Sequence, residues 1–339
     1  RRWGDLMPLI HMVLADNDAE YVHRLAQWFR ENRTRQFQIS AFTSQDSFSK
    51  YLQNGDITAD VILLNESFLT PQLMEKGNII VLGSCSAQLQ SVEKYQTASS
   101  LCSAILSHLS GWDPVKPELG YAGKSSIIVC FSPELRLKST LALWLAAMSR
   151  DHLHISLEAF PYYSLNREAD KTLSDIIYHI KASKSNLSIV LESSVAIYGG
   201  ITYIPPMDNP LDLWELTDKE TCILTEAILS WGRFSNIIVD TEFNTSPRTL
   251  QWLEAASRVI VPFTATYPQP ILKMKSVLST LPGAGTGKYR WVLASQNSSE
   301  SLQQYFDAFH SLPWLEELNY RGSLSLETHM LEQLKALIA

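Results

Sequence analysis

The feature that most constrains the fold is the stretch from residue 125 to 148, SSIIVCFSPELRLKSTLALWLAAM. The apolar run at 127–131 is typical of a strand that is buried on both faces of a sheet. A short polar loop follows, and then an apolar helix that is expected to carry Lys138, Ser139 and Thr140 in its first turn. A buried strand that passes directly into a buried helix predicts an α/β domain.

Strand, loop, Lys-Ser/Thr and helix is also the layout of a phosphate-binding P-loop, in which glycines let backbone N–H groups close around the phosphates. Here residues 133–137 read PELRL and contain no glycine. Side chains at 135–137 bring Cβ atoms into the phosphate volume, and each strained dihedral costs about 1–3 kcal/mol. The carboxylate of Glu134 would repel a triphosphate.

Three interpretations of Lys138, Ser139 and Thr140 remain open. They can be an ordinary helix start with a solvated lysine, a weak nucleotide site, or a site that hydrolyses nucleotide. The missing glycines favour the first interpretation.

Composition narrows the class of protein. The chain has 339 residues, enough for two domains, and its formal charge of −7 argues against a dedicated nucleic-acid binder. Its apolar runs are too short to cross a bilayer, which predicts a cytoplasmic protein without membrane insertion. The four cysteines are widely spaced and lack zinc-ligand spacing, so we expect reduced thiols and no metal.

The first part of the chain alternates apolar strands with amphipathic helices. The pattern predicts strands at 10–15, 37–42, 61–64, 79–82 and 92–95, and helices at 19–31, 44–53 and 98–109. Such alternation is typical of a doubly wound parallel sheet covered on both faces.

This part resembles the receiver domain of bacterial response regulators. The resemblance implies an acidic Mg²⁺ pair at Asp16 and Asp18, a phosphoryl-contacting lysine at Lys94, and a phosphate acceptor at position 65. Position 65 is Asn65, and an amide cannot form an acyl phosphate. We therefore expect a receiver-shaped docking module in which Asp16 and Asp18 are turn and N-cap residues, with a phosphorylated signalling protein as an alternative.

Residues 110–124, SGWDPVKPELGYAGK, are rich in glycine and proline and read as an interdomain linker. The predicted domains are therefore 7–109 and 125–339. The second is expected to continue with strands at 154–157, 201–204, 236–240, 258–263 and 290–294. Its helices are expected at 173–182, 217–231, 247–256, 270–281, 300–309 and 326–338.

The order FSP…KSTLAL, SLEAF, YIPPMDNPLDLWELT and NIIVDTEFNTSPRTLQWLEAASRVIVPFTATY resembles the MinD/ParA group of deviant Walker ATPases. Within that group the chain is most similar to CpaE/TadZ-like proteins, which join an atypical receiver domain to an ATPase domain. The resemblance implies two doubly wound three-layer domains, flavodoxin-like and then P-loop NTPase-like.

The resemblance assigns the P-loop lysine to Lys138, the Mg²⁺-binding hydroxyl to Ser139, with Thr140 after it, and the carboxylate that reaches Mg²⁺ through water to Asp240. Glu158 stands near the acidic residue that orients the attacking water. The family's additional signature lysine is missing, because a proline and a glutamate occupy its place.

We therefore expect a non-catalytic scaffold or localisation protein of a Flp/Tad-type pilus or secretion assembly, without a cofactor. The resemblance implies a homodimer formed through the ATPase-like domain, protein partners in that machine, and recruitment to the cell pole or the inner face of the membrane. The main alternative is an active ATP-switched ATPase that uses ATP and Mg²⁺ to position such a machine.

Overall fold

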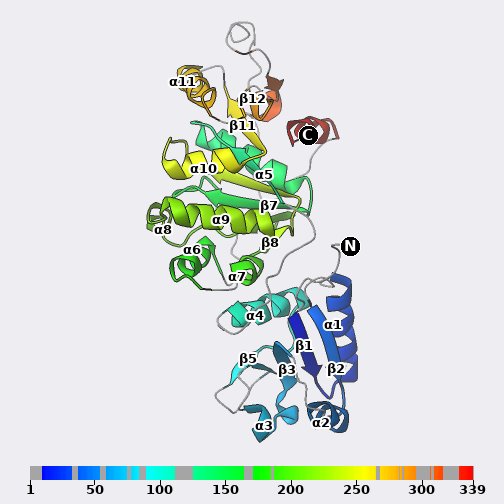
Figure 1. Ribbon diagram of the computed structural model, residues 1–339. Coiled ribbons are helices and arrows are strands. Elements are labelled where there is room, and N and C mark those ends of the chain that lie inside the picture. Colours follow the sequence, from blue (N-terminus) through cyan, green and yellow to red (C-terminus); the bar gives the residue numbers. More distant parts are fainter. Residues whose placement is uncertain are drawn as a thin grey trace, which may run out of the picture. The chain divides into compact units, whose positions relative to one another are not determined.

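The computed structural model (Figure 1) describes residues 10–32, 37–53, 59–74, 78–83, 89–110, 125–163, 171–184, 187–264, 268–281, 283–284, 286–294, 306, 309–315 and 328–338. The chain divides into two compact units. The first contains Arg1–Tyr121 and Lys184–Ser193, and the second contains Ala122–Ser183 and Ser194–Ala339. The expected linker and the expected helix at 300–309 lie mostly outside the described residues.

The first unit is built on a five-stranded parallel sheet in the order β2-β1-β3-β4-β5. This is the strand order of a flavodoxin-like doubly wound fold. Its strands are β1 (Ile10–Ala15), β2 (Phe37–Phe42), β3 (Val61–Asn65), β4 (Ile79–Leu82) and β5 (Gln90–Val92). Its helices are α1 (Ala19–Asn32), α2 (Gln45–Gln53), the short 3-10 helix η1 (Glu66–Phe68), α3 (Pro71–Met74) and α4 (Ala98–Ser110).

The last strand of this sheet differs from the prediction at 92–95. Only Gln90–Val92 pairs with β4, and the chain leaves the sheet at Glu93. The departure lets the Lys94 side chain reach the carboxyl end of β1, where it meets Asp16.

One helix of the first unit comes from much later in the chain. Helix α7 (Leu187–Ser193) groups with the first unit, and Ile189 is fully buried in the core that α1 and α4 form on one face of the sheet. Helix α7 was not predicted, because its seven residues, LSIVLES, are fewer than the two turns from which a helical period can be read.

The second unit is built on an eight-stranded sheet in the order β13-β12-β11-β6-β10-β7-β9-β8, in which only the edge strand β8 is antiparallel. Its strands are β6 (Ser126–Cys130), β7 (His152–Leu157), β8 (Ala196–Tyr198), β9 (Ile201–Ile204), β10 (Asn236–Thr241), β11 (Arg258–Phe263), β12 (Tyr289–Leu293) and β13 (His310–Ser311). Its helices are α5 (Leu135–Ala147), α6 (Leu173–Lys181), α8 (Leu211–Trp214), α9 (Asp218–Trp231), α10 (Pro247–Ala255), α11 (Pro268–Leu278), η2 (Pro313–Leu315) and α13 (Thr328–Ile338).

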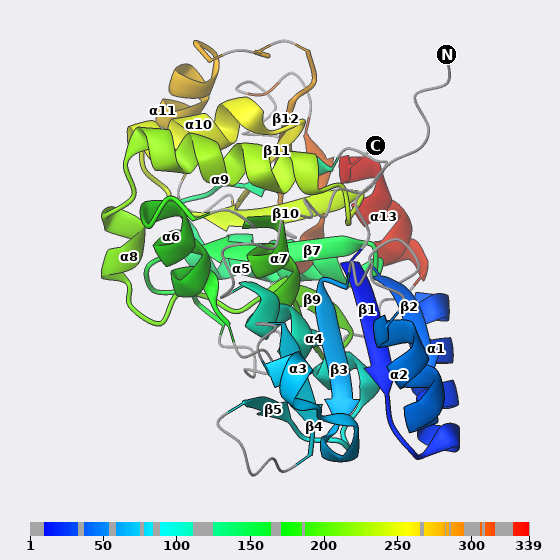
Figure 2. The same ribbon diagram turned by 60° about the horizontal axis from the view of Figure 1, so that its bottom comes forward.

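Both faces of this sheet are covered by helices, which gives three layers (Figure 2). Helix α5 lies along one face, and α13 joins the same core through Leu334 and Leu337. Helices α9 and α10 pack against each other on the opposite side of β6. The central strands β6, β10 and β7 end at one edge, where side chains from three separate parts of the sequence meet.

Candidate functional site

The segment between β6 and α5 is much shorter than a phosphate-binding loop. Helix α5 begins at Leu135, and its first turn is closed by Lys138, whose backbone N–H donates to the carbonyl of Glu134 at 3.0 Å. Lys138 therefore ends the first turn, as predicted, whereas Ser139 and Thr140 lie at the start of the second turn. Leucine and arginine are good helix formers, whereas glycine costs about 1 kcal/mol in a helix. Without glycines, the residues that would wrap the phosphates are wound into the helix instead.

The remaining loop, residues 131–134, is fastened to the neighbouring strand by Glu134. Its carboxylate Oε1 accepts hydrogen bonds from the backbone N–H and the hydroxyl of Thr264, at 2.8 and 3.0 Å, just beyond β11. The Ser132 hydroxyl in turn accepts from the Glu134 backbone N–H at 3.1 Å. A negative side chain is thus held at the N-terminus of α5, the position that a P-loop reserves for phosphate.

Lys138 is enclosed in the protein, with 1% of its surface exposed. Its ammonium forms ion pairs with Glu158 and with Asp240, whose Oδ1 lies 3.0 Å from Nζ, and it donates to the backbone carbonyl of Thr241. An ammonium has three N–H donors, and three oxygen partners surround this one. The interpretation of Lys138 as a solvated lysine is therefore wrong.

The topology explains why the lysine is buried. Strands β7 and β10 are parallel neighbours, with Asp240 opposite Ser156 and Thr241 opposite Leu157. Glu158 and Asp240 therefore come together at the carboxyl edge of the sheet. Two neighbouring carboxylates in a buried site need a cation, and the side chain of Lys138 supplies it from within the chain.

The two hydroxyls after Lys138 are also engaged. Ser139 donates to Asp240 Oδ2 at 2.6 Å. The Thr140 hydroxyl donates to the carbonyl of Arg136 at 2.7 Å and lies 2.7 Å from the hydroxyl of Tyr163. The structure thus brings together Lys138, Ser139, Asp240 and Glu158, as the resemblance implied, while Thr140 faces Tyr163.

In this network, burial and the neighbouring charges shift the pKa values of Lys138 and Glu158 in opposite directions. Burial lowers the pKa of Lys138, but the Asp240 and Glu158 carboxylates outweigh this effect and raise it above the ordinary lysine value. Burial raises the pKa of Glu158, and the nearby Lys138 ammonium offsets only part of that rise. Because both pKa values are raised, Lys138 and Glu158 each hold a proton more strongly than a free lysine or glutamate does.

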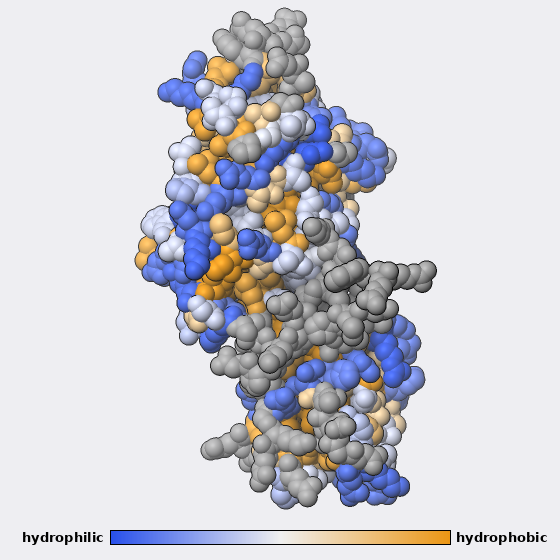
Figure 3. All heavy atoms as spheres, in the orientation of Figure 1, coloured by the Kyte–Doolittle hydropathy of each residue, from blue (hydrophilic) through white to orange (hydrophobic). Residues whose placement is uncertain are grey.

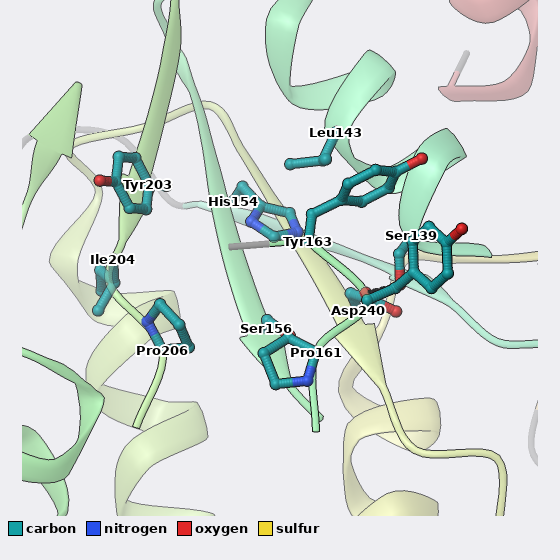
Figure 4. A pocket seen from close by; sticks show the side chains of 11 residues that line it. Ser139, Leu143, His154, Ser156, Pro161, Tyr163, Tyr203, Ile204, Pro206 and Asp240 are labelled. Carbon is teal, nitrogen blue, oxygen red and sulfur yellow. Dashed lines mark hydrogen bonds between the residues drawn. The ribbon is translucent and has the colours of Figure 1, made fainter. Parts of the chain in front are cut away.

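A small cavity lies beside this network, between α5, β7 and the segment after β7 (Figure 4). Ser139 and Asp240 adjoin each other on one side of it, and His154 and Ser156 reach it from β7. Its volume is about 20 Å³, which is room for roughly one or two water molecules. His154 Nε2 is buried and makes no hydrogen bond to the described residues.

These observations decide how well the residues fit a magnesium-bound triphosphate. The lysine faces two carboxylates, Ser139 is bonded to Asp240, and the adjoining cavity holds only water-sized molecules. In this arrangement the site does not fit Mg-ATP. Among the described residues, no group of three or more His, Cys, Asp or Glu side chains is arranged to hold a metal ion.

The receiver-like site of the first unit is closed by a similar ion pair. Lys94 Nζ lies 2.9 Å from Asp16 Oδ2 and 3.9 Å from Asp18 Oδ2. Asp18 caps α1 by accepting from the Tyr21 backbone N–H at 3.0 Å, as the N-cap interpretation expected. Asn65 accepts from the backbone N–H of Ser67 at 3.0 Å and caps η1. The structure therefore brings the two aspartates and Lys94 together, and it uses Asn65 as a helix cap.

Sequence reasoning missed several residues that complete the two sites. Tyr21 donates to the Lys94 carbonyl at 2.9 Å, and the Lys94 ammonium lies 4.9 Å from the centre of its ring. The carbonyl of Thr241, the carboxylate-binding Thr264 and the hydroxyl of Tyr163 contribute to the second site. None of these residues belongs to a sequence motif, because each one contributes through a contact with a residue that is distant in the sequence.

Comparison with known proteins finds similar solved structures of low sequence identity. No model of a known protein family matches the chain, and no curated protein matches it. Similar solved structures include MinD from Pyrococcus furiosus, which is 15% identical with a TM-score of 0.43 over 63% of this chain and 98% of its own. A ParA family ATPase from Chlorobium tepidum is 14% identical with a TM-score of 0.41, over 63% of this chain and 90% of its own. A McdA variant from Cyanothece in complex with ATP is 11% identical with a TM-score of 0.45, over 64% and 96%.

Removing the lysine should destabilise the second unit. Lys138→Met leaves Glu158 and Asp240 buried without a cation, and breaking a buried pair costs about 3–5 kcal/mol. We expect a loss of this size in the free energy of opening, measured by hydrogen exchange of β7 and β10 amides in the full chain. Lys335→Met, which removes the surface pair of Lys335 with Glu332, is the control and should cost less than about 1 kcal/mol. A loss for Lys138→Met as small as that of the control would contradict the network.

Acid should destabilise the same unit through His154. Burial lowers the pKa of His154 from 6.5 to about 4, so the unfolded chain binds a proton that the folded chain excludes. The stability contributed by the neutral imidazole is present above pH 6.5 and is lost as the pH falls towards 4, by about 3 kcal/mol in total. His154→Gln should flatten the stability profile in urea titrations between pH 6.5 and 4. Identical profiles for the wild type and His154→Gln would show that this histidine is not held neutral.

Proposed function

We propose that this protein is a non-catalytic scaffold in which a MinD/ParA-like unit works through protein contacts and not through ATP binding and hydrolysis. The observation that carries the proposal is the Lys138 ammonium held between Glu158 and Asp240. A lysine that neutralises two carboxylates of its own chain is not available to a triphosphate. To release it, the protein would have to leave both carboxylates unpaired in a buried site.

The start of α5 supports the same proposal. Nucleotide binding at this fold needs consecutive backbone N–H groups that converge on the phosphates. The first turn of α5 occupies the sequence that would provide them, and Glu134 adds a negative charge at its end. Rebuilding the cradle would require unwinding a helical turn and removing Glu134 from Thr264.

The assembly that the scaffold serves is inferred from the resemblance to CpaE/TadZ-like proteins. We infer a role in placing a Flp/Tad-type pilus or secretion machine, with recruitment to the cell pole or the inner membrane face and a homodimer formed by the MinD/ParA-like unit. With the site closed by its own lysine, such a dimer would be independent of nucleotide. None of the described helices combines the length and apolarity needed to span a bilayer.

One observation favours the ATP-switched alternative. Lys138, Ser139 and Asp240 converge at the end of β6 and β10, where a working enzyme of this fold would hold the phosphates and the metal. If ATP can displace Glu158 from the lysine, the same residues would become a binding site. A phosphorylated signalling role has less support, because the candidate acceptor is an amide and Asp16 is paired with Lys94.

Calorimetric titration with Mg-ATP separates the scaffold from the switch. The scaffold predicts no binding up to millimolar nucleotide for the full chain, and no change on Glu158→Gln, which keeps the shape of the side chain. The switch predicts micromolar binding that Lys138→Ala abolishes. A Kd in the micromolar range with that loss would overturn the proposal.

A further inference from the structure

Three large apolar side chains project into solvent on one side of the second unit. Tyr178 on α6 is 65% exposed, and Leu211 and Trp214 on α8 are 51% and 54% exposed. Tryptophan and tyrosine are usually largely buried, and they are the residues that most often dominate the energy of protein interfaces. We call Tyr178, Leu211 and Trp214 the α6–α8 surface.

Helix α8 is hydrogen-bonded to α6 on both sides of Tyr178. Ser174 donates to Asp212, and Lys181 Nζ donates to the backbone carbonyl of Glu215 at 2.8 Å. Ser174, Tyr178 and Lys181 are spaced four and three residues apart, so they lie on one stripe of α6. Tyr178 therefore lies along the face of α6 that α8 contacts.

Acidic residues predominate around α8. Between residues 205 and 220 the sequence has one lysine, Lys219, and five carboxylates, which are Asp208, Asp212, Glu215, Asp218 and Glu220. Helix α6 and its ends add Asp175 and three lysines, which are Lys171, Lys181 and Lys184. The nearby Lys181 is engaged by Glu220 at 3.6 Å. Among the described residues, no cation lies within ion-pair distance of Asp212, Glu215 or Asp218. The hydroxyl that contacts Asp212 is neutral and leaves its charge in place.

This charge pattern restricts what can bind. Phosphate backbones and anionic lipids are repelled by a cluster of carboxylates. A second copy of this chain, with a formal charge of −7, is also a poor match for an acidic surface. Charge complementarity favours a protein segment with an excess of lysine or arginine and an apolar residue to contact Trp214.

We propose that the α6–α8 surface is a docking site for a basic protein segment that carries an apolar anchor. Trp214 and Leu211 contact the anchor, and Asp212, Glu215 and Asp218 attract the flanking positive charges. Figure 3 shows this side of the molecule, where apolar and strongly hydrophilic residues lie next to each other over α8 at the left edge. The inference deepens the proposed scaffold function by naming the chemistry of a partner, and it does not involve the nucleotide site.

A displayed library of random 16-residue peptides tests the proposal on the full-length protein. The library is selected on the wild type, and the enriched peptides are synthesised and titrated by fluorescence anisotropy. We expect enriched peptides with a net positive charge and at least one large apolar residue. Trp214→Ala should weaken their binding about tenfold or more, and Glu215→Lys should weaken it severalfold and reduce its dependence on salt.

Matched controls lie on the first unit, where Tyr95→Ala removes another exposed aromatic ring and Glu93→Lys reverses another exposed charge. Both variants should bind the selected peptides like the wild type. The proposal is overturned if no peptide is enriched, if the enriched peptides lack a positive charge, or if Trp214→Ala retains wild-type affinity. Binding of DNA or anionic vesicles that Trp214→Ala abolishes would also overturn it. The readout is peptide capture, so its failure leaves the Mg-ATP result unaffected.

Discussion

The ion pairs of Lys138 with Glu158 and Asp240 are the interaction on which the second unit depends. They join α5 to the carboxyl ends of β7 and β10, and they place a cation between two carboxylates that could not otherwise be buried together. The resemblance to MinD/ParA ATPases assigns Lys138 and Asp240 to the binding of substrate and metal. Here Lys138, Glu158 and Asp240 pair with one another, so these residues form part of the core.

The helix start and the buried lysine have a common cause. The glycine-free segment PELRL lets α5 begin at Leu135, and its side chains occupy the space above the sheet. Lys138 closes the first turn of α5 and faces the strand ends. Tyr163 and Thr264 close the remaining space by contacting Thr140 and Glu134. The start of α5 at Leu135 and the closure of the site around Lys138 therefore belong to the same arrangement.

Much of this fold could be read from the sequence, because buried parallel strands are short apolar runs separated by amphipathic helices. The strands 10–15, 37–42 and 258–263 were predicted with the bounds they have, and the two α/β units with largely parallel sheets are confirmed. Tertiary contacts decided the parts that were missed. Helix α7 is too short to show a period, and β5 ends at Val92, which leaves Lys94 outside the sheet and paired with Asp16. The exposure of Lys138 could not be read from its neighbours in sequence, since Glu158 and Asp240 are distant along the chain.

In the proposed scaffold, the Lys138 ammonium stays bound to its own carboxylates when nucleotide is offered. Nitrogen-15 NMR of lysine ammonium groups observes this directly, because a buried, ion-paired ammonium exchanges its protons slowly enough to be seen. Lys138→Met identifies the resonance by its disappearance. We expect a Lys138 signal at neutral pH that millimolar Mg-ATP does not move. A signal that shifts or vanishes on addition of Mg-ATP, and returns when the nucleotide is removed, would contradict it.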